Sequence, residues 1–170
     1  MNISNLQYDN PFEELGIGVE IEKKPLRIIE IEFESLKEYY DSFHRTLDYL
    51  SDLDTRLITI VSEPVPLKLP IQFNQHNSKS KKLIITEPIN PKFTEFLIKY
   101  LSENEFRNSE DFLCIGKFAT WEAKSIYEFQ PVKFDELKGL FFFSEDRLTM
   151  NSLIYEKEFE TSYMNFISNF

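Results

Sequence analysis

Histidine and cysteine are the side chains that enzymes most often use for proton transfer and nucleophilic attack, and this sequence has two histidines and one cysteine. His44 has Asp41 and Asp48 about one helical turn to either side. A carboxylate neighbour can orient an imidazole for catalysis, although a charge pair on a helix surface is the commoner arrangement. His76 falls in a polar, basic stretch where we expect it to be solvated. Cys114 lies among apolar strand residues, which predicts a buried and inert thiol.

Two short stretches match fragments of known site motifs. Residues 16–18 read Gly-Ile-Gly but lack the third glycine and the following helix of a dinucleotide-binding loop. Residues 78–81 have Ser-x-x-Lys spacing without the apolar helix and the companion motifs that accompany it in penicillin-binding enzymes. Two histidines and one cysteine also cannot complete an ordinary four-ligand zinc site without carboxylates. The sequence therefore predicts no catalytic residue, no metal ligand and no cofactor.

Five glutamates supply the main functional hypothesis. Residues 17–22 and 29–34 both alternate apolar side chains with glutamate, the pattern of a strand with one solvent-facing side. The intervening Lys23-Lys24-Pro25 predicts a turn and therefore an N-terminal β-hairpin. In such a hairpin one face would carry all five side chains, which are Glu20, Glu22, Glu30, Glu32 and Glu34.

Three interpretations of this acidic face remain open. Like charges opposite one another destabilise a sheet, and the first interpretation is a solvated surface that discourages edge-to-edge aggregation. The second is a docking face whose repulsion is relieved by a cationic partner. A divalent-metal site is the third interpretation, although side chains spread along flat strands seldom converge on one ion. Trp121 and Tyr127 are candidate exposed aromatic contacts for a partner.

The remaining patterns predict an α+β fold. The expected architecture is a mixed or antiparallel sheet with the N-terminal β-hairpin, two amphipathic helices on one face and a C-terminal helix. The expected helices are 36–51, with a capping box that begins at Ser35, about 91–103, with Asn90 as N-cap, and one from about 159 to the end. Further strands are expected at 56–62, 83–86, 112–118, 126–129, 140–144 and 152–155, with an exposed loop at 74–82. The order from the second strand to residue 118 is that of ferredoxin-like domains.

Length and composition predict one domain, residues 1–170, with a polar lead-in at 1–15. A single cysteine excludes an intrachain disulfide, and no secretory signal or membrane-spanning stretch is visible, which favours a cytoplasmic location. The net charge of −10 disfavours direct contact with nucleic acid or an anionic membrane and favours a basic protein partner.

These features together predict a non-enzymatic inhibitor that masks a basic protein surface, in the manner of an acidic immunity protein neutralising a nuclease toxin. Two alternatives remain. One is a small hydrolase with a site built from two carboxylates, and the other is an accessory subunit of a larger complex.

Overall fold

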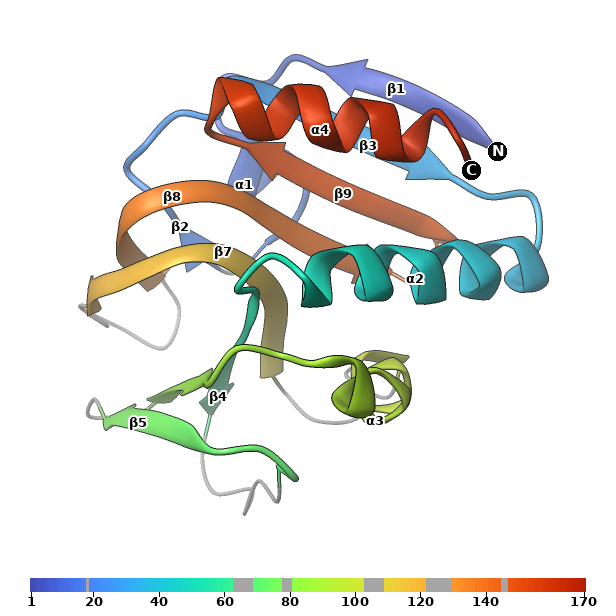
Figure 1. Cartoon of the computed structure of the whole chain (residues 1–170). Helices are drawn as coiled ribbons and strands as arrows, with labels where there is room; N and C mark the ends of the chain where they lie inside the picture. Colours follow the sequence, from blue (N-terminus) through green and yellow to red (C-terminus); the bar gives the residue numbers. More distant parts are fainter. Residues whose placement is uncertain (18, 63–68, 78–80, 103–108, 122–129, 145–146) are drawn as a thin grey trace.

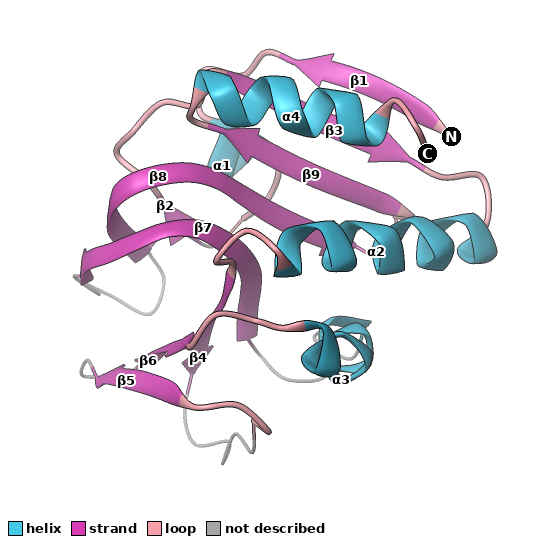
Figure 2. Cartoon of the chain, viewed as in Figure 1, coloured by secondary structure: helices cyan, strands magenta, loops and turns pink. Residues whose placement is uncertain are grey.

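The computed structural model describes residues 1–17, 19–62, 69–77, 81–102, 109–121, 130–144 and 147–170. The elements in chain order are β1 (Asn2–Leu6), α1 (Pro11–Glu14), β2 (Val19–Glu20), β3 (Arg27–Glu32), α2 (Leu36–Ser51), β4 (Arg56–Ser62), β5 (Phe73–Asn77), β6 (Lys81–Thr86), α3 (Pro91–Ser102), β7 (Ser109–Trp121), β8 (Gln130–Ser144), β9 (Thr149–Ile154) and α4 (Lys157–Ile167). Strands β1-β3-β9-β8-β7-β4-β6-β5 form one sheet in that order, with every neighbouring pair antiparallel (Figures 1 and 2). The short strand β2 lies beside β8 in parallel. The predicted α+β fold is therefore confirmed.

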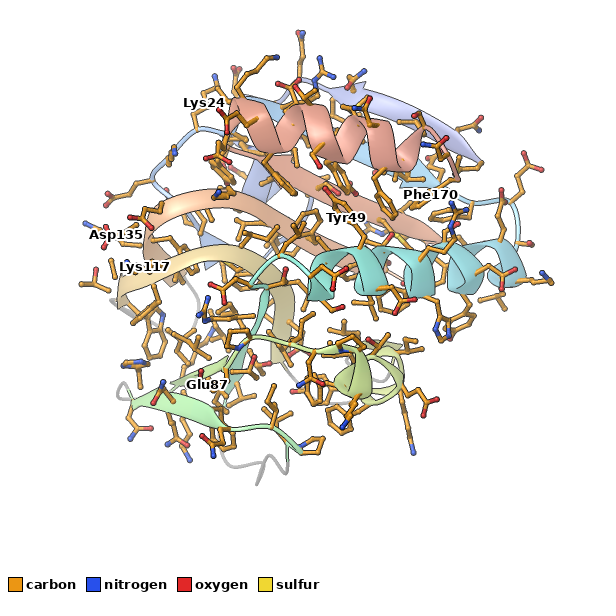
Figure 3. All side chains as sticks on the ribbon, in the orientation of Figure 1. Lys24, Tyr49, Glu87, Lys117, Asp135 and Phe170 are labelled. Carbon is orange, nitrogen blue, oxygen red and sulfur yellow. The ribbon has the colours of Figure 1, made fainter. Side chains whose placement is uncertain are left out.

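The sheet has a hydrophobic cluster on each face. The helix-side cluster joins α2, α3 and α4 to sheet residues such as Ile29, Ile31 and Phe141. Between α2 and α4, the ring of Tyr49 stacks on Phe166 with centroids 4.2 Å apart (Figure 3). The second cluster lies on the opposite face, where α1 and the segment through β2 cover part of the sheet. No helix in the described part of the chain is long and apolar enough to cross a membrane.

Helix α2 begins where the sequence predicts. The Ser35 side chain accepts a hydrogen bond of 3.2 Å from the Glu38 N–H, and the Glu38 carboxylate accepts one of 3.0 Å from the Glu34 N–H. The buried stripe starts later than expected, because Leu36 is 52% exposed and Tyr39 takes its place in the core.

The predicted N-terminal β-hairpin is wrong. Strand β3 lies between β1 and β9, and β2 pairs with β8. Strand β9 therefore separates β3 from the strand that β2 pairs with. The backbone N–H of Leu26 already donates to the Ile154 carbonyl over 2.7 Å, so the chain joins β9 directly after the expected turn. The apolar side of 17–21 packs onto the second cluster, where Ile17, Val19 and Ile21 are buried. Burial of these three side chains against the sheet, and not pairing with the strand nearest in sequence, therefore decides where this segment lies.

Further differences concern the sheet. The expected loop at 74–82 contains the edge strand β5, whose five side chains are all exposed. The ferredoxin-like order is wrong, because β9, β8 and β7 separate β3 from β4. Strands β7 and β8 are longer than expected and curve strongly, with register shifts at 115/117 and 118/120 (Figure 1). The strand expected at 126–129 lies outside the described residues.

Candidate functional site

Two rows of side chains run across strands β8, β9, β3 and β1, on the sheet face opposite helices α2, α3 and α4. The first row reads Ser144, Thr149, Glu32 and Asn2, and the second reads Phe142, Asn151, Glu30 and Ser4, as the strand register sets them opposite one another. We call the polar members of these rows the polar patch, which comprises Asn2, Ser4, Glu30, Glu32, Ser144, Thr149 and Asn151.

Alternation along the strands fixes which face the patch occupies. Ile29, Ile31 and Met150 belong to the helix-side cluster, so the residues between and beside them point the other way. The next row along the strands is apolar and belongs to, or packs against, the second cluster, with Leu140, Leu153, Ile28 and Leu6. The polar patch therefore begins where the α1–β2 cover over the sheet ends.

The two glutamates of the patch carry negative charge that no ion pair neutralises among the described residues. Glu30 is half-buried and Glu32 is exposed. Partial desolvation is the main cause that raises the pKa of Glu30, and the neighbouring Glu32 raises it further, while Arg147 acts in the opposite direction. Within the described ranges, no lysine or arginine forms an ion pair with either glutamate.

Two acceptor atoms of the patch lack hydrogen-bond partners. Thr149, which is 6% exposed, has a buried Oγ1 without a partner, and Asn151 has a buried Oδ1 without one. The register places Thr149 directly opposite Glu32 and Asn151 directly opposite Glu30. An unsatisfied buried polar atom costs roughly 1–3 kcal/mol, so these positions favour a ligand that donates hydrogen bonds.

The five predicted glutamates do not share one face, which corrects the expectation from the sequence. Glu20 and Glu22 are exposed on the segment that covers the second cluster, and Glu22 pairs with Lys133 at 2.9 Å. Glu34 lies beyond β3 and is 3.4 Å from the N-terminal ammonium of Met1. The separation follows from the absence of the hairpin. Only Glu30 and Glu32 of the five stand side by side on the sheet, and a binding role for any of the five stays a prediction.

Of the two aromatic contacts expected from the sequence, only Trp121 lies within the described residues. Trp121 is half-buried and packs against the second cluster, with its indole Nε1 buried and lacking a hydrogen-bond partner. Its ring therefore contributes to packing, and a role in partner binding stays a prediction. Tyr127 lies outside the described residues.

Of the other candidate reactive groups, Cys114 is buried, while the two histidines lie on α2 and β5. Cys114 is 1% exposed, and burial raises the pKa of its thiol, so the predicted core position is confirmed. The His76 ring lies 4.8 Å from that of Phe118, and His44 is exposed on α2. In the described part of the chain, no group of three or more histidine, cysteine, aspartate or glutamate side chains could hold a metal ion.

A cleft of about 450 Å³ opens between the end of α2 and the start of α4, above the bend of β7 and β8. Its acidic side chains are Asp54, Glu136, Glu156 and Glu158. Three of these already have basic partners, in the pairs Asp54–Arg56 at 3.1 Å, Glu156–Lys138 at 3.4 Å and Glu136–Lys117 at 3.9 Å. The cleft is thus largely charge-compensated, unlike the polar patch, and it is the weaker candidate for attracting a cation.

Comparison of the chain with protein-family models, with curated proteins and with solved structures finds no match.

Proposed function

We propose that this chain is a non-enzymatic binding protein that places an acidic surface against a basic surface of a protein partner, as an immunity protein masks a nuclease toxin. The observation that carries the proposal is the pair Glu30 and Glu32, two neighbouring carboxylates on one sheet face that form no ion pair among the described residues.

Electrostatics explains why a cation is the fitting partner. The two carboxylates repel each other and Glu30 is partly desolvated, so both effects oppose the charged form of that group. A positive group docked on the patch attracts both carboxylates and so offsets their mutual repulsion. The hydrogen-bonded strands β9, β3 and β1 fix the backbone positions of these residues before binding, which lowers the entropic cost of association.

The whole molecule supports the same partner class. A net charge of −10 speeds encounter with cationic proteins and repels phosphate backbones and anionic membranes. A cytoplasmic site of action is part of the proposal, since a toxin's producer must neutralise it where it is made.

Purified basic nucleases test the proposal directly. Biolayer interferometry at low and moderate salt should detect binding of the wild-type chain to at least one such protein, and binding should weaken as salt rises. The double variant Glu30→Gln/Glu32→Gln should lose at least ten-fold in affinity. The matched control Glu87→Gln/Asp135→Asn removes the same charge from two exposed positions elsewhere on the molecule (Figure 3) and should lose far less.

Two results would contradict the proposal. One is the absence of binding to every basic protein at both salt concentrations. The other is an equal loss of affinity in the double variant and in its matched control, because that would assign binding to net charge alone.

A further inference from the structure

We infer that the polar patch receives the guanidinium group of an arginine from the partner. The inference rests on the proposed function and adds the chemical identity of the group that is recognised. Its basis is the set of four acceptor side chains that the strand register brings together, which are Glu30, Glu32, Thr149 and Asn151.

The spacing of the carboxylates suits a planar, multi-donor cation. Glu30 and Glu32 are two residues apart on one strand, so their Cα atoms are separated by roughly 7 Å on the same face. A guanidinium presents five N–H donors in a fixed plane and pairs with carboxylates through parallel hydrogen bonds. It is therefore able to donate to both side chains at once.

The number of acceptors favours arginine over lysine. An ammonium has three donors, and the two carboxylates alone are sufficient to accept them. Thr149 Oγ1 and Asn151 Oδ1 add two neutral acceptors that have no partner in the structure. A guanidinium has enough donors for all four groups, and it is also more weakly hydrated than an ammonium, so it loses less on entering a partly buried site.

Access to the two orphan oxygens requires local movement. Both are shielded from solvent, so a ligand reaches them by displacing the atoms that cover them. Glu32 is exposed and Glu30 is half-buried, so the end of each side chain can rotate. Arg147, which follows β8, already acts electrostatically on Glu30 but forms no ion pair with it, which leaves the carboxylate open to a second cation.

Two short blocked peptides, glycine-arginine-glycine and glycine-lysine-glycine, separate the possibilities when titrated at low salt into the isotopically labelled chain and followed by amide chemical shifts. The arginine peptide should cause saturable shifts at 30–32 and 149–151, with an affinity at least three-fold higher than that of the lysine peptide.

The variant Thr149→Val/Asn151→Ala removes the two neutral acceptors and keeps both glutamates. Thr149→Val preserves the shape of the side chain and removes an unsatisfied hydroxyl, so we expect the variant to fold, which its amide spectrum reports. Its affinity for the arginine peptide should fall to the level of the lysine peptide, while the affinity for lysine stays unchanged.

Equal shifts with both peptides, a variant with unchanged arginine preference, or shifts confined to the α2–α4 cleft would overturn the arginine site. Each of these results leaves the proposed function standing if the nuclease panel still shows binding that depends on Glu30 and Glu32. Absence of binding in that panel would reject the proposed function itself.

Discussion

Glu30 and Glu32, the residues of the proposed docking surface, lower the stability of the folded chain at neutral pH. The pKa of Glu30 is raised above the ordinary 4.5 in the folded chain, so folding favours its protonated form. The stabilising contribution of the group is therefore complete below pH 4.5 and is lost as pH rises through the higher folded-state pKa. At neutral pH the pair of carboxylates is a small net cost.

Replacement of Glu32 by glutamine should consequently stabilise the chain at pH 7. We expect a gain of about 0.3 kcal/mol in the free energy of unfolding, small because solvent screens a pair that is mostly exposed. Urea titrations at pH 7 and pH 3 measure it, and the gain should vanish at pH 3, which lies below the raised pKa of Glu30, because the protonated Glu30 no longer repels Glu32. A stability loss at pH 7 would show that Glu32 has a stabilising contact inside the molecule.

Glu160 on α4 should behave in the opposite way. Its carboxylate accepts a hydrogen bond of 2.6 Å from Lys157 and lies 3.0 Å from Arg27 Nε, and the Lys157 bond followed by the Arg27 charge lowers its pKa. The stabilisation is thus present at neutral pH and is lost as pH falls below 4.5 through the lowered pKa. Glu160→Gln should cost about 1 kcal/mol at pH 7 and almost nothing at pH 2. A pH-independent cost, measured by urea unfolding, would point to lost packing instead of lost charge.

Of the four acceptor side chains in the polar patch, the sequence could identify only the two glutamates. Glu30 and Glu32 alternate with buried isoleucines, which a local pattern reveals. Thr149 and Asn151 carry no local signal, because their role depends on β9 lying beside β3, and the two strands are more than 110 residues apart in the chain.

At the scale of elements, α4 docks on β8 at a position that admits no side chain. A Cβ atom added to Gly139 would lie 2.9 Å from a ring carbon of Phe159 and 3.0 Å from one of Phe141. Both rings are buried in the helix-side cluster, so neither can move away freely.

Gly139→Ala should therefore push α4 away from the sheet and lower the free energy of unfolding by roughly 1–3 kcal/mol. Thermal or urea unfolding measures the loss. Gly16→Ala serves as the comparison, because Gly16 has open space around its Cβ position, so any cost there comes from its φ of 68° and not from a steric clash. If Gly139→Ala costs less than about 0.5 kcal/mol, the contact between α4 and β8 is looser than the structure shows.

Helices were easier to predict than strand pairing for a physical reason. The cap at Ser35 and the apolar stripe of α2 act within a few residues of each other, so sequence alone locates the helix. Strand partners are chosen by burial across the whole fold. Residues 17–21 have the pattern of a strand that would pair with 29–33, yet their apolar side chains fill the second cluster instead.

At the scale of the whole molecule, one sheet separates two hydrophobic clusters and contributes side chains to both. Strand β9 shows the consequence, because its Met150 and Ile154 face the helices while Leu153 faces the α1–β2 segment. Loss of either cluster removes support from the same hydrogen-bonded strands. The two sides of the sheet are therefore expected to unfold together, as one domain.

Matched core truncations on the two faces test this expectation. Leu47→Ala removes a fully buried side chain from the helix-side cluster, and Leu153→Ala removes one from the second cluster. Each should lower the free energy of unfolding by about 2–5 kcal/mol, the cost of a leucine cavity. In both variants, thermal transitions followed by far-ultraviolet and near-ultraviolet circular dichroism should coincide, since the shared strands transmit the loss to the opposite face. If Leu153→Ala instead produces an early transition that leaves the helical signal intact, the α1–β2 side unfolds independently and the polar patch at its border would be held by the helix-side cluster alone.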